Sequence, residues 1–246
     1  MILPTFTDRE KEWEAVRICD YAYEVAMDYI EEMGKILFSR KHFPAYERIC
    51  FTDDKHNDWR LVFFIPSKEY AKKRLVGDVC YTTYEIPAKR CKNQTNAGKG
   101  VILFSPIELT KRLKSKETQK GSFISEYVPH AINRFTERYL IPNGLVDLDI
   151  HKKVEKLITR NFHFDILADK CGDISAKKHF EEKGGICSYD VVTKEGGLLR
   201  GSVASGFLVR FYTYIPPKML HDSQMERIAE MTREKHRWKN SRLDCY

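Results

Sequence analysis

Residues 130–138 carry side chains whose types and spacing suit acid–base chemistry on a phosphate. His130, Arg134 and Arg138 follow one another at intervals of four, so on a helix they form one stripe. An imidazole titrates near neutrality and moves protons, whereas guanidinium groups hold phosphate oxygens and stay charged. Asn133 and Glu137 flank the stripe. The alternative is a solvated helix face, on which both arginines pair with Glu137 and other carboxylates while His130 caps or packs.

Three predicted strands, residues 186–193, 197–204 and 207–215, supply a second polar set. Every second residue of a strand points to the same face. If the polar faces of the three strands coincide, one surface presents Asp190, Arg200, Ser202, Arg210, Tyr212 and Tyr214. Arginine binds phosphate, and tyrosine stacks on bases. The alternative is a one-sided antiparallel sheet, in which Asp190 and Arg200 form a cross-strand ion pair.

The two sets together resemble the barnase/RelE-type ribonuclease-toxin group. The resemblance covers about residues 125–220. It rests on a helix with His-x-x-x-Arg-x-x-x-Arg, followed after a spacer by a small antiparallel sheet that ends in Arg-Phe-Tyr-Thr-Tyr-Ile. Members of that group generally cut RNA without a metal, with a few His, Arg, Lys, Tyr, Ser or Thr side chains on the sheet and its helix.

The resemblance implies general acid–base cleavage, in which the ribose 2′-hydroxyl attacks the adjacent phosphorus. His130 would act as the base, or as the acid that protonates the leaving 5′-oxygen. Arginines would stabilise the charge on the phosphoryl oxygens, and a tyrosine would stack on the base or share the proton transfer. The predicted catalytic residues are therefore His130, Arg134, Arg210 and Tyr212, and the predicted nucleic-acid contacts are Arg138, Arg200, Ser202, Tyr214, Lys89 and Arg90.

The charge of the chain is compatible with a polyanionic partner. Lys and Arg number 42 and Asp and Glu 35, a net charge of +7 in 246 residues. Basic clusters lie at 72–74, 89–92, 111–114 and 233–239. The second cluster contributes Lys89 and Arg90, and the last carries Trp238 among cations, a composition typical of nucleic-acid contact. Such clusters also occur on solvated faces, so they support RNA or single-stranded DNA as the partner without establishing it.

No motif in the sequence predicts a metal or another cofactor. The sequence has no H-E-x-x-H and no C-x-x-C, which argues against a zinc site, and no P-loop. Seven widely spaced cysteines and a start without a signal-like segment predict reduced thiols in the cytoplasm. No apolar run is long enough to span a bilayer, so we expect no membrane contact.

The periodicity of the sequence predicts an α+β fold with a long N-terminal helix and antiparallel strands in both halves. The helix covers 8–33, with Thr7 and Glu10 as a capping box and Gly34 as its stop. Bulky runs predict strands at 59–65, 78–86 and 100–104. Further helices are expected at 107–120 in part, 129–140, 148–160 and 222–238, and the last three strands form a meander with helices packed against it.

The basic stretch near residues 113–122 divides the chain into a half over 1–120, with the long helix and β-strands, and an α+β half over 121–246. One continuous domain is the alternative. For function, the lead hypothesis is a nucleic-acid-directed protein, in its most specific form a metal-independent ribonuclease. The alternatives are a non-catalytic binding or interaction module with a protein partner, and a scaffold that forms a homodimer through the long helix.

Overall fold

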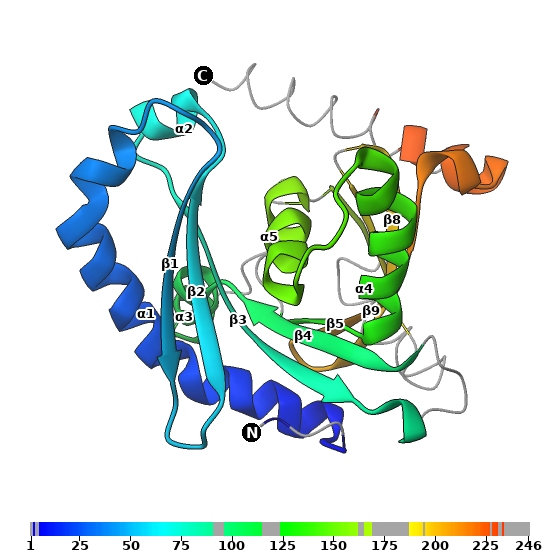
Figure 1. Ribbon diagram of the computed structural model, residues 1–246, viewed down its shortest axis with the longest axis horizontal. Coiled ribbons are helices and arrows are strands. Elements are labelled where there is room, and N and C mark those ends of the chain that lie inside the picture. Colours follow the sequence, from blue (N-terminus) through cyan, green and yellow to red (C-terminus); the bar gives the residue numbers. More distant parts are fainter. Residues whose placement is uncertain are drawn as a thin grey trace.

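One large sheet runs through both halves of the molecule (Figure 1). The computed structural model describes residues 2, 5–90, 96–114, 124–161, 165–168, 187–193, 195–226, 228–230 and 233. Within them the strands form a nine-stranded sheet of order β1-β2-β3-β4-β5-β9-β8-β7-β6, antiparallel at every step except β5–β9. The strands are β1 (Ala45–Thr52), β2 (Asp58–Ile65), β3 (Gly77–Ile86), β4 (Gly98–Phe104), β5 (Ile124–Tyr127), β6 (Asp165–Ala168), β7 (Cys187–Val192), β8 (Leu198–Ser205) and β9 (Leu208–Ile215).

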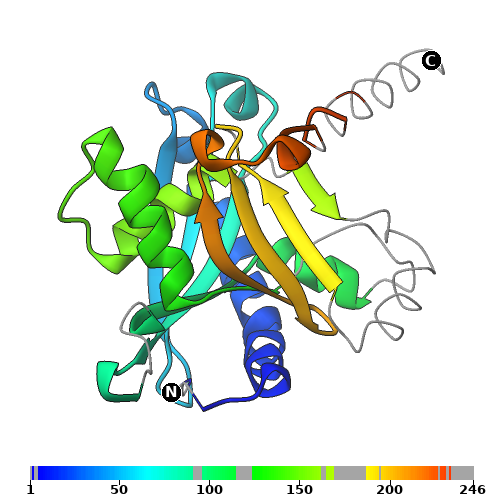
Figure 2. The same ribbon diagram turned by 90° about the vertical axis from the view of Figure 1, so that its right-hand side faces the viewer.

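Helices cover the two faces of this sheet and define two cores. The described helices include α1 (Asp8–Phe38), α2 (Lys68–Lys72), α3 (Pro106–Lys114), α4 (Pro129–Phe135) and α5 (Ile150–Asn161), with a π-helical segment, η3 (Thr136–Leu140), directly after α4, and residues 222–226 and 228–230 are helical as well. On one face, α1 and α3 pack on side chains such as Trp59, Phe63 and Phe104. On the other, α4, η3 and α5 pack on Tyr81 and Phe211 among others. Figure 2 shows α4 and α5 beside each other on one side of β9.

Helix α1 begins where the sequence predicts and ends later. Thr7 and Glu10 form the capping box. The predicted stop at Gly34 is wrong, because the helix continues to Phe38 and is capped at Ser39. A Cβ built on the buried Gly34 would lie 3.5 Å from the Phe38 ring, an ordinary van der Waals contact, so packing inside the helix does not require a glycine there. Nothing forces a left-handed turn there, and the helix propensity of the following residues prevails.

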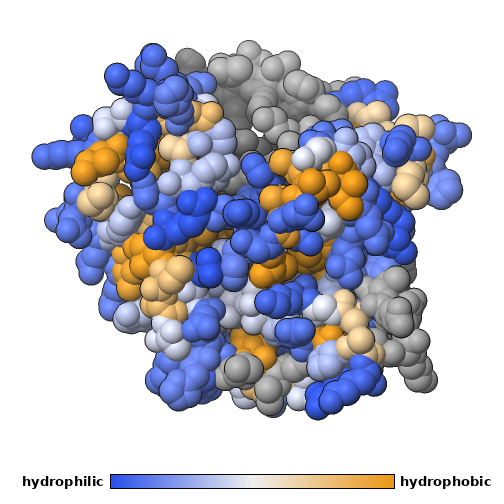
Figure 3. All heavy atoms as spheres, viewed as in Figure 1, coloured by the Kyte–Doolittle hydropathy of each residue, from blue (hydrophilic) through white to orange (hydrophobic). Residues whose placement is uncertain are grey.

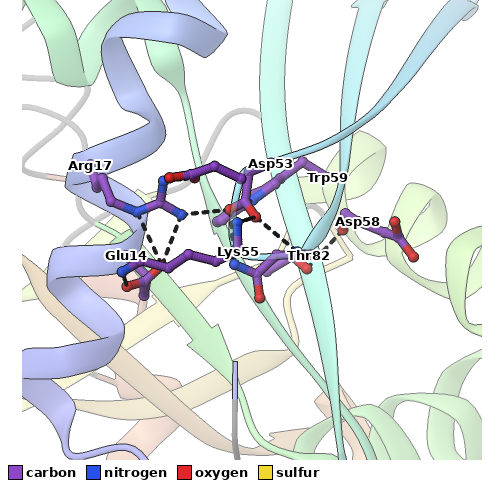
Figure 4. A network of polar contacts seen from close by, with 9 residues as sticks. Glu14, Arg17, Asp53, Lys55, Asp58, Trp59 and Thr82 are labelled. Carbon is purple, nitrogen blue, oxygen red and sulfur yellow. Dashed lines mark hydrogen bonds and ion pairs between the residues drawn. The ribbon is translucent and has the colours of Figure 1, made fainter. Parts of the chain in front are cut away.

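Two polar networks fix α1 to the sheet. At the β1–β2 turn, Arg17 donates to Asp53 at 2.6 Å, and Asp53 also accepts from the indole of Trp59 at 2.9 Å (Figure 4). Lys55 pairs with Glu14 of α1. Burial raises the pKa of Asp53, but its hydrogen bonds to Asn57, Trp59 and Arg17 outweigh burial and hold the pKa well below its usual value. The carboxylate therefore stays charged and orients the hairpin against the helix.

The second network lies at the parallel junction of β5 and β9. Glu126 of β5 is fully buried and accepts from Lys11 and from the Tyr84 hydroxyl, each at 2.7 Å. Its other oxygen accepts from Arg210 of β9 at 2.6 Å, and Arg210 also pairs with Asp8. Burial alone raises the pKa of Glu126, yet Lys11 and Arg210 outweigh it and lower the pKa. The start of α1 is thereby tied to the point where the two groups of strands meet.

The fold class predicted from sequence is confirmed. The predicted strands 59–65, 78–86 and 100–104 are β2, β3 and β4, and the meander is β7–β9. Strand β1 and the short strands β5 and β6 were not predicted, the last because residues 161–183 were interpreted as helical in part. The proposed boundary at 113–122 falls largely outside the described residues, and β5 joins the strands on either side of it into one sheet. The second half of helix 222–238 also lies mostly outside them. No described helix is both long and apolar enough to cross a membrane.

Candidate functional site

The predicted stripe on α4 exists, but its charged groups are engaged with neighbours. Arg134 donates to His130 Nε2 at 3.4 Å and forms an ion pair with Glu137 at 2.7 Å. Arg138, in η3, donates to the backbone carbonyl of Tyr214 at 2.7 Å. The stripe therefore matches the ion-paired alternative at Arg134, and Arg138 connects the helix to the end of β9.

A β-bulge in β9 overturns the predicted grouping of its side chains. Gly201 of β8 pairs with Phe211 and Arg200 pairs with Thr213, so Tyr212 is an extra residue in β9. Alternation restarts after it, and Tyr214 shares the α4 face with Phe211. Tyr214 is buried there, edge-on to Phe135 of α4 at 5.5 Å between ring centroids. The prediction that Tyr212 and Tyr214 share one face is wrong, because strand periodicity cannot anticipate the inserted residue.

The remaining meander residues lie on the α1 face and are largely paired. Arg210 is held by Glu126 and Asp8. Burial lowers the pKa of Arg210, but the two carboxylates outweigh it and the pKa is raised. Arg200 and Asp190 form the cross-strand ion pair of the alternative interpretation, at 3.4 Å. The hydroxyls of Ser202 and Tyr212 lie 2.9 Å apart.

The sheet therefore separates the residues predicted to be catalytic. His130 and Arg134 stand on the α4 face, whereas Arg210 and Tyr212 stand on the opposite face beside α1. A single substrate phosphate cannot touch both pairs, because the sheet lies between them. Lys89 and Arg90 lie elsewhere again, exposed in the short helical turn after β3 (η1, Ala88–Arg90).

A different constellation, which sequence reasoning missed, lies on the α4–α5 face. We call it the shelf: Arg60 of β2, Tyr81 of β3, Lys99 of β4 and His151 of α5. Arg60 and Tyr81 are register partners, and Lys99 comes from the strand beyond β3. In Figure 1 the lower part of β3, below α5, has no helix in front of it, whereas α4 crosses and packs against β4. Figure 3 shows hydrophilic and hydrophobic residues interspersed over this face.

Tyr81 positions the imidazole of His151. Their polar atoms, Oη and Nδ1, lie 3.2 Å apart. Burial raises the pKa of Tyr81, so the phenol keeps its proton and we assign it as the donor to Nδ1. Burial is the largest cause that lowers the pKa of His151, and the charge of Arg60 comes next. Lys99 lowers this pKa further, whereas Asp149 and Glu155 raise it. The imidazole is therefore neutral at pH 7, and its Nε2–H is left as a hydrogen-bond donor.

The cations of the shelf are not neutralised. Within the described part of the chain, the guanidinium of Arg60 and the ammonium of Lys99 form no hydrogen bond or ion pair. By contrast, Arg48 on the neighbouring β1 donates two hydrogen bonds to the carboxylate of Glu155 of α5. A half-buried guanidinium without a carboxylate is unusual, since buried charge is normally paired. The shelf thus offers two cations and one neutral donor to an anion, although Glu85 of β3 is the register partner of Lys99 and lies next to it.

The chemistry of the shelf is that of anion binding. Phosphate oxygens accept from guanidinium, ammonium and imidazole N–H donors alike. In the described residues no group of three or more His, Cys, Asp or Glu side chains is placed to hold a metal ion. The one sequence signal for the shelf is Arg60 itself, a charged residue on the same strand face as the apolar Val62 and Phe64.

Comparison with known proteins does not place the chain in a family. No protein-family model matches the sequence, and neither a curated protein nor a solved structure matches the chain.

Proposed function

We propose that this chain binds single-stranded RNA through the phosphates of the strand, at the shelf, and does not cleave it. The observation that carries the proposal is the unneutralised Arg60 guanidinium beside the His151–Tyr81 pair. Arg60 holds two phosphate oxygens in this scheme, Lys99 supplies a second charge, and His151 donates from Nε2.

The basic residues around the shelf support a strand rather than a small anion as the ligand. Lys89 and Arg90 lie in the connection between β3 and β4, at the same end of the sheet as Lys99, because Ile86 pairs with Gly98. Lys152 is exposed in the first turn of α5, next to His151. A phosphate backbone that enters the shelf would pass these cations on either side, as electrostatic binding of single strands requires.

The charge of α1 favours the same face. This helix holds nine acidic and four basic residues, a net charge of −5 in a chain of +7, so the rest of the chain carries +12. Because α1 covers the opposite face of the sheet, a polyanion is repelled there and attracted to the α4–α5 side.

Cleavage is not part of the proposal, because the acid–base and phosphate-binding groups expected from the ribonuclease resemblance stand on opposite faces of the sheet. A neutral His151 whose Nδ1 accepts from Tyr81 has no free lone pair with which to remove a proton from a 2′-hydroxyl.

The test is fluorescence polarisation with a labelled 16-nucleotide RNA of mixed sequence, with single-stranded DNA as a second arm. Arg60→Gln should weaken RNA binding by about tenfold to a hundredfold, since a charge-assisted hydrogen bond contributes about 1.5–3 kcal/mol. The matched control is Arg9→Gln, which removes an exposed arginine from α1. The RNA should stay intact in EDTA over hours.

Equal affinities for wild type and Arg60→Gln would refute the shelf as the binding site. RNA cleavage that is lost in His130→Ala would instead support the ribonuclease hypothesis. Binding of DNA with higher affinity than RNA would correct the ligand and leave the site in place.

A further inference from the structure

We propose that the outward face of α1 docks on the shelf side of a second copy of this chain, so that the protein self-associates head to tail until RNA displaces the contact. The acidic α1 face consists of Tyr21, Glu24, Met27, Asp28 and Glu31, all of them exposed. These positions recur at intervals of three and four and therefore form one outward strip of the helix.

The acidic α1 face combines charge without partners and apolar side chains. Glu24, Asp28 and Glu31 form no ion pair with any residue that the structure describes. Met27 is 41% exposed, and Tyr21 is 51% exposed even though its ring lies edge-on to Phe51 of β1 at 5.2 Å between centroids. Elsewhere on the helix several carboxylates are engaged, as with Asp8, Glu14 and Asp20, although the exposed Glu32 forms no ion pair with any described residue. A long helix that leaves apolar side chains in water next to unneutralised acids has the composition of an interface with a basic partner surface.

The shelf side of another copy is such a surface. The molecule already shows how a helix docks on this sheet face, because α5 packs there and its Glu155 accepts two hydrogen bonds from Arg48. The same face continues to Arg60, which has no carboxylate among the described residues, and to Lys99. The acidic α1 face of a neighbour would bring Glu24 and Asp28 to these cations in the way that α5 brings Glu155 to Arg48.

Charge also decides against the symmetric alternative. Two copies joined α1 to α1 would place Glu24 and Asp28 opposite the same carboxylates of the partner, and like charges in such positions repel. The heterologous contact brings opposite charges together, and it forms open chains or closed rings rather than only dimers. RNA and the acidic α1 face would bind the same cations. The release of the contact by RNA therefore rests on the proposed function, whereas the contact itself does not.

The experiment is sedimentation velocity at rising protein concentration in about 50 mM salt, where charges are screened least. Wild type should exceed the monomer mass of 28.9 kDa and return to it at high salt or with a stoichiometric excess of the 16-nucleotide RNA. Two variants separate the surfaces: Glu24→Lys/Asp28→Lys reverses the α1 face, and Arg60→Gln/Lys99→Glu removes the shelf cations. Each should be monomeric alone, whereas an equimolar mixture of the two should associate, because the first variant keeps an intact shelf and the second an intact acidic α1 face.

A further test mixes each variant with wild type. In either mixture the variant retains one intact surface, so it should join a wild-type chain at one end and stop its growth, which lowers the average mass. The control Glu69→Lys/Asp222→Lys reverses two exposed acids away from α1 and should associate like wild type. A monomeric wild type at every concentration, or unchanged association of Glu24→Lys/Asp28→Lys, would overturn the proposal.

The two proposals fail in distinguishable ways. Glu24→Lys/Asp28→Lys keeps an intact shelf and should bind RNA at least as well as wild type. If wild type associates but no form binds RNA, the proposed function fails and the self-contact stands. If RNA binds at the shelf but wild type is monomeric, the self-contact alone is refuted.

Discussion

Asp78 is a residue whose ionisation opposes the fold. It is 5% exposed in β3 and accepts from the Ser105 hydroxyl and from the backbone N–H of Ile107, both at 3.2 Å, at the start of α3. Burial raises the pKa of Asp78 to about 6, although these hydrogen bonds lower it. The folded chain therefore binds a proton at Asp78 more tightly than the unfolded chain does.

The pH dependence of stability follows from that difference. The stabilising contribution of protonated Asp78 is complete below pH 3.8 and is lost as pH rises to about 6. The side chain of Asp78→Asn is neutral at every pH, so the variant should lack this pH-dependent loss of stability, which is about 3 kcal/mol at most. Relative to wild type, the variant should therefore be more stable at pH 7.5 than at pH 4. Urea unfolding at both pH values measures it. A stability difference between variant and wild type that does not change with pH would contradict the assignment.

Single residues also explain why the candidate site escaped sequence reasoning. Arg60, Lys99 and His151 are far apart in the sequence and belong to β2, β4 and α5. Only the sheet register places the first two on one face, and only α5 brings the third above them. The stripe on α4 was visible because helical spacing is local. Its partners were not, since an extra residue such as Tyr212 leaves no mark on strand alternation.

At the scale of elements, strong local patterns were predicted and pairings were not. Strands β2, β3 and β4 carry continuous apolar or β-branched runs and were found. Strand β1 was missed because it is an edge strand with alternating exposure and two charged residues, Glu47 and Arg48. The parallel pairing of β5 with β9 joins residues about 84 positions apart, as between Glu126 and Arg210, and no local signal specifies it.

That parallel junction depends on one buried carboxylate. Glu126→Gln should destabilise the protein by about 3–5 kcal/mol, because it leaves Lys11 and Arg210 with reduced compensation in a buried place. Urea unfolding measures the loss. The control is Glu69→Gln, which breaks an exposed ion pair with Lys73 and should change stability by less than about 1 kcal/mol. Equal losses in the two variants would show that the junction does not rely on the charge.

At the scale of the whole molecule, the account rests on charge separation across the sheet. The α1 side is acidic, and the shelf side presents cations that the described chain does not neutralise. Net charge was readable from the sequence, but its division between two faces was not, because it depends on which face of the sheet α1 covers. The same division supplies both proposals, since RNA and the acidic α1 face would compete for one set of cations.

The salt dependence of RNA binding tests the central claim most directly. If Arg60, Lys99, Lys89 and Arg90 each neutralise a phosphate, the logarithm of the association constant should fall against the logarithm of salt concentration with a slope of about −3, at about 0.7 per phosphate. Arg60→Gln should make that slope shallower by about 0.7, and Arg9→Gln should leave it unchanged. A slope near zero, or the same slope in wild type and Arg60→Gln, would contradict binding at the shelf.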